Sequence, residues 1–307
     1  MGLDVVSPLF GIMLAGYLSG RFRMLDEASS AVLSRFVYVV AMPALIFISL
    51  SRVPVRDFFD WDFIATLGGG MLTIFCLSFL IARLVFPDSL TAHSLHALTA
   101  MFSSTAYIGL PMILLIFGES ALVPGIIGAV ITGAVFLPIG IILAEIDKGV
   151  GKGRNIFPPL MGVVRSPILL ATASGLIVSA SGVAVPGPMA AFCELLGGAF
   201  IPCALFAAGL FIASCSVEGE ATEIGWLVFV KLLLHPMITW WLAYRVFALD
   251  GILPVIAVLQ AALPSGVPVF VLAQQYQTFV SRSGAVIVAS TILSVFTVTV
   301  LLSILVP

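Results

Sequence analysis

The chain has 307 residues, of which 61% are hydrophobic and only 9% are charged. Soluble domains average about 25% charged residues, so this composition excludes an ordinary soluble protein and predicts an all-α polytopic membrane protein in a lipid bilayer. The net charge is −2, and no basic run or Lys/Arg–aromatic patch points to nucleic acid as a partner.

Apolar stretches long enough to cross a membrane follow one another along the whole chain. Such a helix needs about 20 apolar residues. Reading from one polar break to the next predicts ten spans, at 4–20, 29–51, 62–86, 92–117, 121–144, 160–182, 187–215, 221–247, 252–276 and 280–306. The longest polar stretch, Glu145–Asn155, divides them into five and five. We therefore expect a first five-helix repeat over 1–144, a cytoplasmic loop over 145–157 and a second repeat over 158–307.

The basic residues predict how these spans are oriented. Cytoplasmic loops of membrane proteins carry an excess of Lys and Arg. Loops on the N-terminal side hold three basic residues, Arg52, Arg56 and Arg245. Loops on the opposite side hold nine, namely Arg21, Arg23, Arg35, Arg83, Lys148, Lys152, Arg154, Arg165 and Arg282. This asymmetry predicts that both termini are extracytoplasmic and that the central loop is cytoplasmic. The expected location is the plasma (inner) membrane.

An odd number of spans in each half means that the second half is inserted upside down relative to the first. The residue pattern supports such an inverted repeat. Arg35 precedes Pro43 by eight residues in the second span, and Glu194 precedes Pro202 by eight in the seventh. The fourth and ninth spans each contain Gly-x-Pro, ending at Pro111 and at Pro268. The alternative explanation is that Gly and Pro are simply frequent in membrane helices.

The fourth and ninth spans are also where Pro, Gly and polar residues interrupt the apolar sequence. Proline removes a helix hydrogen bond, and freed backbone groups are tolerated in a membrane only inside protein or beside a cavity. Broken helices at matching positions in two halves indicate a transporter's binding site. The expected substrate-binding residues are Ser103, Ser104, Thr105, Tyr107, Gly109, Pro111, Gln260, Pro264, Ser265, Gly266 and Pro268.

Ionisable residues within spans are costly and so become functional candidates. Lys231 lies about ten residues into the eighth span, near the expected midplane. It could balance an anionic substrate, carry a proton, or form a structural salt bridge, for instance with Glu194. His235 follows one turn later and could share the proton route or be structural. Glu194 could pair with Lys231, titrate during transport, or face a water-filled vestibule.

Motifs for catalysis or metal binding are not seen in the sequence. Paired carboxylates, HExxH, Gly-x-Ser-x-Gly and phosphate loops are absent, so we expect no enzyme and no cofactor. The four cysteines lack metal-ligand spacing and are interpreted as small buried hydrophobic residues; no metal site is predicted.

Several motifs together resemble the auxin efflux carrier family over essentially the whole chain. They are Pro8–Tyr17 followed by Leu25-Asp26-Glu27, Leu33–Tyr38 leading to Met42–Phe47, Tyr107–Pro111, Val230-Lys231-Leu232-x2-His235-Pro236, and Phe270–Tyr276. The short central loop makes the bacterial branch, with its malonate-transporter-like members, the more similar one.

The resemblance implies ten helices in two inverted repeats with broken, crossed fourth and ninth helices, similar to the bile-acid symporter and sodium/proton antiporter folds. It also implies alternating access, transport of small organic anions and a homodimer. One departure is that the family usually has Asn just before the fourth-helix Gly-x-Pro, where this chain has Ser103, Ser104 and Thr105.

The sequence therefore predicts a secondary active transporter or uniporter for a small organic anion, a carboxylate above all, with protons as the preferred coupling ion. One alternative is a sodium-coupled symporter of the bile-acid type, for which Gln260 and Gln274 are the available amide ligands. A non-transporting membrane receptor or scaffold is the alternative from another class.

Overall fold

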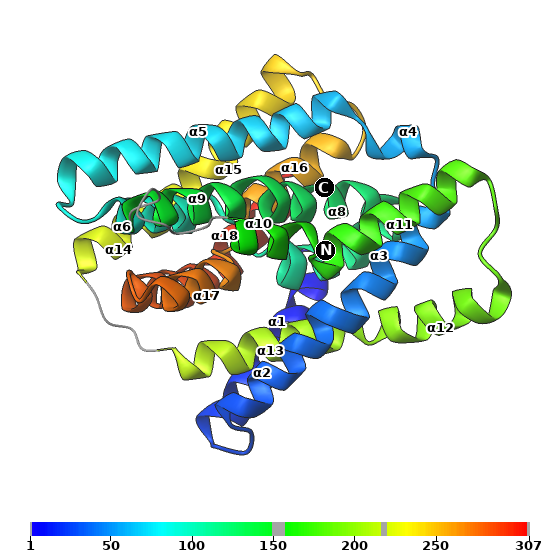
Figure 1. Ribbon diagram of the computed structural model, residues 1–307, viewed down its shortest axis with the longest axis horizontal. Coiled ribbons are helices and arrows are strands. Elements are labelled where there is room, and N and C mark those ends of the chain that lie inside the picture. The colour runs from blue at the N-terminus through cyan, green and yellow to red at the C-terminus, as the bar shows by residue number, and fades with distance from the viewer. Residues whose placement is uncertain (1, 149–156, 216–219, 306–307) are drawn as a thin grey trace. The chain divides into compact units, whose positions relative to one another are not determined.

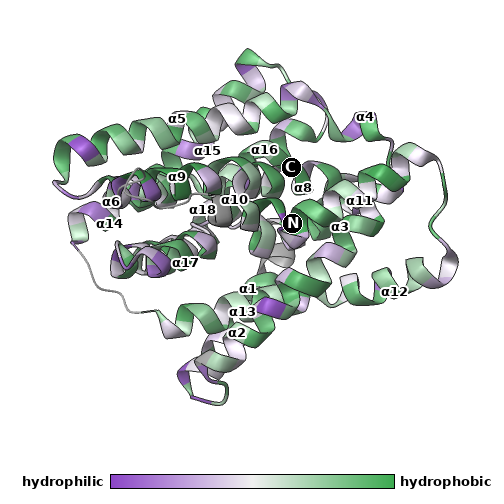
Figure 2. Cartoon of the chain, viewed as in Figure 1, coloured by the Kyte–Doolittle hydropathy of each residue, from purple (hydrophilic) through white to green (hydrophobic). Residues whose placement is uncertain are grey.

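The structure is a computed structural model that describes residues 2–148, 157–215 and 220–305 (Figure 1). Within these ranges every regular element is a helix, and the only β-type pairing is one bridge between Ser103 and Ser265. Six largely helical segments of the described residues are long and apolar enough to cross a membrane: Ala28–Ser51, Val55–Val85, Glu119–Asp147, Gly187–Ser214, Ala221–Val246 and Val280–Leu305. Hydrophobic residues extend along most of the helices (Figure 2). These features are those of an all-helical polytopic membrane protein.

Four of the ten expected spans are interrupted rather than continuous, the seventh only by a turn at Ala199. The fourth and ninth spans each contain an extended segment between two helices. The sixth is divided at Ser166. The Ser166 hydroxyl accepts a hydrogen bond from the Leu169 amide at 3.3 Å and so caps a new helix that begins at Pro167. Ten crossings therefore remain a prediction.

The described chain divides into two compact units, each with segments from both sequence halves. Unit 1 comprises Met1–Trp61, Ala106–Val130 and Val164–Ser214, and unit 2 comprises Asp62–Thr105, Ile131–Val163 and Cys215–Pro307. These units are not the two sequence repeats proposed above, which concern chain order and stay a prediction. Of the expected loop at 145–157, residues 149–156 lie outside the described residues, and residues 145–147 continue the preceding helix.

Unit 1 is built on close helix–helix contacts. Its helices are α1 (Gly2–Arg21), α2 (Glu27–Phe36), η1 (Val37–Ala41), α3 (Met42–Ser51), α4 (Val55–Phe58), α7 (Leu110–Phe117), η3 (Glu119–Ala121), α8 (Leu122–Ile131), α11 (Pro167–Ser181), α12 (Gly187–Gly198) and α13 (Phe200–Ser214). α1 packs along α13, and α3 packs against α11 and α12. A Cβ at Gly16 would lie 2.2 Å from the carbonyl oxygen of Phe206, so only glycine allows this approach.

Unit 2 holds the remaining helices around an apolar core. They are α5 (Trp61–Val85), α6 (Leu90–Met101), η4 (Thr132–Phe136), α9 (Leu137–Asp147), α10 (Phe157–Val164), α14 (Ala221–Phe229), η5 (Val230–Leu234), α15 (His235–Trp241), η6 (Leu242–Val246), α16 (Leu253–Ala262), α17 (Val267–Tyr276) and α18 (Val280–Leu305). Met71, Leu98, Phe136, Leu227 and Val286 are buried in one cluster, to which α5, α6, η4, α14 and α18 each contribute. The short η2 (Thr105–Gly109) begins at the last residue of a unit 2 segment and continues in unit 1.

Wide π-helical turns precede four of the prolines in the described helices. In the described residues η1, η2, η4, η5 and η6 are π-helical, and each of the first four ends two residues before a proline: Pro43, Pro111, Pro138 and Pro236. Proline has no N–H and clashes with the preceding turn, and a wider turn accommodates both effects. Pro202 differs from its expected counterpart Pro43, because α12 ends at Gly198 and a new helix begins at Phe200.

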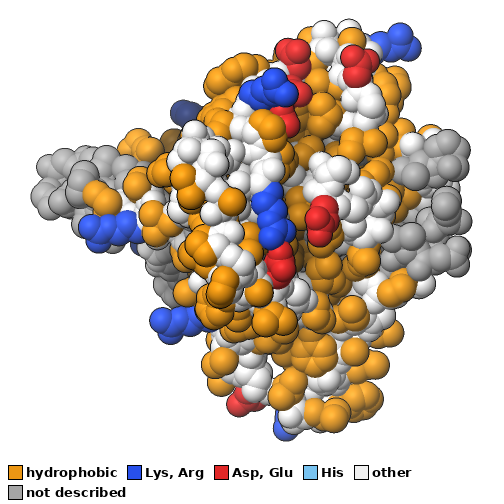
Figure 3. Space-filling model, turned by 90° about the vertical axis from the view of Figure 1, so that its right-hand side faces the viewer, with side chains coloured by type: hydrophobic (Ala, Val, Ile, Leu, Met, Phe, Trp, Pro, Cys, Tyr) orange, Lys and Arg blue, Asp and Glu red, His pale blue; other side chains and the backbone are white. Residues whose placement is uncertain are grey.

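Many large apolar side chains are exposed on these helices, among them Leu84, Ile177, Leu195, Phe296 and Ile304. One face of the molecule shows hydrophobic side chains predominating, with scattered charges (Figure 3). Such a surface fits contact with lipid. All four cysteines are free; Cys193 is buried as expected, whereas Cys76 is exposed and Cys203 and Cys215 are partly exposed, so the expectation of four buried cysteines was wrong.

Candidate functional site

The two interrupted spans meet through their backbones in unit 2. α6 ends at Met101 and α16 ends at Ala262, and both continue as extended chain. The Ser104 amide donates to the Pro264 carbonyl at 2.9 Å, and the Gly266 amide donates to the Phe102 carbonyl at 3.0 Å. Backbone groups freed by the breaks therefore satisfy each other, which a membrane interior requires.

Polar side chains from both breaks are buried around this pairing. Ser103, Ser104, Thr105, Gln260 and Ser265 each have at most 6% of their surface exposed. The Ser265 hydroxyl donates to the Thr99 carbonyl at 2.9 Å, and the Thr105 hydroxyl forms no hydrogen bond within the described residues. A buried hydroxyl without a partner is costly, so Thr105 has capacity for a ligand.

Lys231 extends from η5 to the same backbone pairing. Its side chain is fully buried, and its Nζ lies 2.6 Å from Ser103 Oγ and 3.0 Å from the Ala261 carbonyl oxygen. His235 Nδ1 lies 3.0 Å from the same amine. The structure thus brings Lys231 and His235 together with Ser103 of the fourth span and Ala261 of the ninth.

Three other predicted site residues belong to unit 1. Tyr107, Gly109 and Pro111 follow the break, and the Tyr107 hydroxyl donates to the Ser34 carbonyl at 3.4 Å. Gly109 precedes α7, in which Pro111 occupies the second position. Their part in a substrate site stays a prediction.

Glu194 also lies in unit 1, where its carboxylate pairs with the guanidinium of Arg52. About half of each side chain is exposed. Both residues line a cavity of about 460 Å³ that also includes Ser49, Glu119 and Ser120. Glu194 therefore has a partner other than the suggested Lys231, and its polar cavity is compatible with the vestibule alternative.

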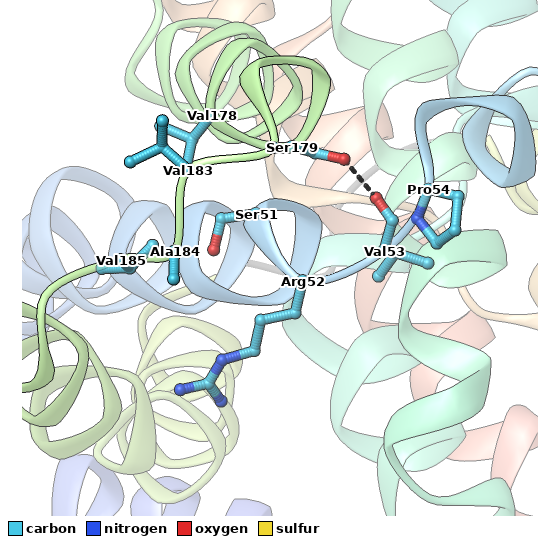
Figure 4. A pocket seen from close by; sticks show the side chains of 10 residues that line it. Ser51, Arg52, Val53, Pro54, Val178, Ser179, Val183, Ala184 and Val185 are labelled. Atoms are coloured by element: carbon cyan, nitrogen blue, oxygen red, sulfur yellow. Dashed lines mark hydrogen bonds between the residues drawn. The ribbon is translucent and has the colours of Figure 1, made fainter.

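A second cavity of unit 1, of about 610 Å³, lies beside the end of α3 (Figure 4). The Ser179 hydroxyl donates to the Val53 carbonyl at 2.5 Å and ties α11 to the segment after α3. The Arg52 side chain extends away from this hydrogen bond. Because Arg52 lines both cavities, it is the cation available to an anion in either one.

An ionic network in unit 2 was not anticipated from the sequence. Glu223 of α14 accepts from Arg282 Nη1 at 3.1 Å and contacts His96 Nδ1 at 2.9 Å. Arg282 Nη2 also donates to Asp88 at 2.6 Å. The sequence could have predicted this network, because its residues lie near the first turns of three helices, α6, α14 and α18, where opposite charges can meet.

Asp88 lies in the loop between α5 and α6, at the edge of this network. Burial disfavours its charged form, but the hydrogen bond and charge of Arg282 and the Ser89 amide outweigh that effect, so the pKa of Asp88 is below its usual value of 3.8. The carboxylate is ionised at neutral pH and fastens the loop to α18.

Metal coordination has no support in the described ranges, where His, Cys, Asp and Glu form no group of three suited to a metal ion. The buried polar side chains beside the breaks instead carry hydroxyls, the Gln260 amide, the His235 imidazole and the Lys231 amine.

Comparison with known sequences decides the family. The profile of the family described as "Membrane transport protein" matches residues 2–302. The chain belongs to this membrane transport protein family. The resemblance to auxin efflux carriers is thereby confirmed, and the family's members are transporters rather than enzymes.

Individual relatives of this membrane transport protein match three quarters of its length or more. It is 32% identical to a "Putative malonate transporter" of Rhizobium meliloti over 97% of this chain and 94% of the relative. It is 28% identical to an "Uncharacterized transporter" of Methanothermobacter thermautotrophicus over 95% of this chain and 94% of the relative. The "Uncharacterized transporter YfdV" of Escherichia coli is 29% identical over 75% of this chain and 74% of its own length.

Proposed function

We propose that this protein is a secondary active transporter or uniporter that moves a small organic anion, a carboxylate, across the inner membrane by alternating access. The proposal includes ten spans in two inverted repeats, crossed fourth and ninth helices, extracytoplasmic termini and a homodimer. The relative named for malonate makes short dicarboxylates the first substrates to test.

The observation that carries the proposal is the buried Lys231 amine beside two helix breaks. Lys231 lies at the pairing of Ser103 and Ser265, and α17 begins directly after it at Val267. The positive end of a helix dipole and an ammonium group both favour an anion, and the Thr105 hydroxyl offers a further hydrogen bond. Substrate at this place would use the breaks as its binding site.

A proteoliposome uptake screen tests this function. Purified protein is given radiolabelled mono- and dicarboxylates, malonate included, under imposed pH and sodium gradients. We expect saturable uptake of a dicarboxylate that responds to the pH gradient or membrane potential. Uptake driven only by sodium would favour the bile-acid type of symport, and a folded protein with no flux for any anion would favour a receptor or scaffold.

Single substitutions test the site within the same assay. Lys231→Ala should abolish uptake while folded protein remains, and normal uptake would exclude a role for its charge. Ser104→Ala and Ser265→Ala should change the apparent substrate affinity, and unchanged affinity in both would place the substrate elsewhere. Glu194→Gln distinguishes two roles of Glu194. Uptake driven by a pH gradient should be lost if Glu194 carries the proton, and should remain if Glu194 only lines a vestibule.

A further inference from the structure

The surroundings of the Lys231 amine are those of a small cation site. α6 and α16 end at this place, and the last carbonyls of a helix lack partners within it. Two of those carbonyl oxygens face the amine: that of Ala261 at 3.0 Å and that of Met101 at 3.5 Å. Ser103 Oγ completes the oxygen ligands at 2.6 Å.

The geometry fits a charged ammonium group. Its three protons meet three acceptors within 3.0 Å, namely Ser103 Oγ, the Ala261 carbonyl oxygen and His235 Nδ1. An ammonium group has no acceptor, so His235 Nδ1 is assigned as the acceptor. Among the described residues no carboxylate hydrogen-bonds to Nζ, and the carbonyl oxygens that face it lie at the negative ends of two helices, which favour a cation.

Carbonyl oxygens at the ends of broken helices, together with hydroxyls, are also the ligands with which transporters hold a monovalent coupling cation. We propose that Lys231 is a built-in replacement for such a cation: its ammonium permanently fills a monovalent-cation site formed by Met101, Ala261 and Ser103. The wild-type protein then needs no sodium at this site. Removing the side chain opens the site to sodium or to a small alkylammonium ion.

The inference goes beyond the proposed function, which leaves the coupling ion open. It rests on the proposed function in one respect: the cation can be a coupling ion only if the protein is a transporter. The test below uses thermal unfolding and needs no flux, so an absence of uptake would count against the transport proposal and leave the cation site standing.

The experiment compares wild type and Lys231→Ala, both purified in detergent, in choline, sodium or ethylammonium chloride at equal ionic strength. The wild-type melting temperature should be the same in all three salts. Lys231→Ala should melt lower in choline, and sodium or ethylammonium should raise its melting temperature by about 2–4 °C or more. A Lys231→Ala protein that responds to neither cation would overturn the proposal, as would a sodium-dependent wild type.

Three further variants make the result specific. Adding Ser103→Ala to Lys231→Ala removes one oxygen ligand and should shrink the cation response. Lys148→Ala is the matched control, because its amine lies over the Tyr276 ring at 4.6 Å from the centroid, and it should show no cation response. Lys231→Met keeps the side-chain volume without the charge and should melt below wild type in every salt; equal stability would overturn the proposal even if Lys231→Ala failed to fold.

Discussion

Ser103 and Ser265 face each other in an antiparallel bridge at the point where two membrane helices are interrupted. The two serines are 162 positions apart in the chain, yet Lys231 contacts the side chain of the first and the helix end that precedes the second. This relationship lets backbone groups freed by two costly helix breaks satisfy each other within an apolar unit.

The backbone pairing of the two breaks leaves no room for a side chain at Gly266. A Cβ there would lie 2.8 Å from the Phe102 ring and 3.3 Å from the Ser103 carbonyl oxygen. Gly266→Ala should therefore destabilise the protein by about 1–3 kcal/mol through overpacking. Thermal unfolding in detergent measures the loss. Gly68→Ala in α5, where a Cβ meets nothing within 4 Å, should be neutral or stabilising, and equal effects of the two variants would refute the steric argument.

The α1–α13 contact should show the same dependence on glycine. Gly16→Ala places a methyl group against the Phe206 backbone, which cannot move aside as a flexible side chain can, and should cost about 1–3 kcal/mol or more. Gly11→Ala in the same helix has open space and is the matched control. Chemical unfolding followed by intrinsic fluorescence distinguishes them; indistinguishable midpoints would mean that α1 and α13 do not pack this closely.

Glu223 should contribute strongly to the stability of unit 2. Glu223→Gln weakens two charge-assisted hydrogen bonds of a side chain that is only 3% exposed, and should cost about 1.5–3 kcal/mol. Glu119→Gln changes an exposed carboxylate and should have little effect. The readout is the melting temperature in detergent, and a Glu223→Gln protein as stable as Glu119→Gln would show that the network adds nothing.

Asp88 should make stability fall in acid. Its pKa is lowered in the folded protein, so its contribution is present above the usual value of 3.8 and is lost as pH falls through the folded value. Asp88→Asn should lower the melting temperature at neutral pH and flatten its decline below about pH 4. Melting curves from pH 3 to 7 check this, with the exposed Asp62→Asn as control. A decline as steep in Asp88→Asn as in wild type would assign the acid sensitivity to other groups.

The candidate site divides into parts that were predictable and parts that were not. Pro264, Pro268 and Pro111, with their neighbouring glycines, predicted the interruptions of the ninth and fourth spans, because proline cannot complete a helix ladder. The partners of charged residues were not predictable in the same way. Glu194 pairs with Arg52 rather than with the suggested Lys231, and His96 was not singled out. Pairing depends on which helix faces meet, and local sequence does not specify those.

The sequence by itself determined that this is an all-helical membrane protein, that its fourth and ninth spans are interrupted, and that a lysine lies deep in the eighth span. These properties follow from composition and from the local chemistry of proline, glycine and apolar runs. Only the tertiary structure decided that the two breaks pair, that Lys231 fills the oxygen site between Ser103 and Ala261, and that Asp88, Glu223 and Arg282 form one network. Hydrogen bonds and ion pairs act over about 3 Å, so they are set by the packing of distant segments.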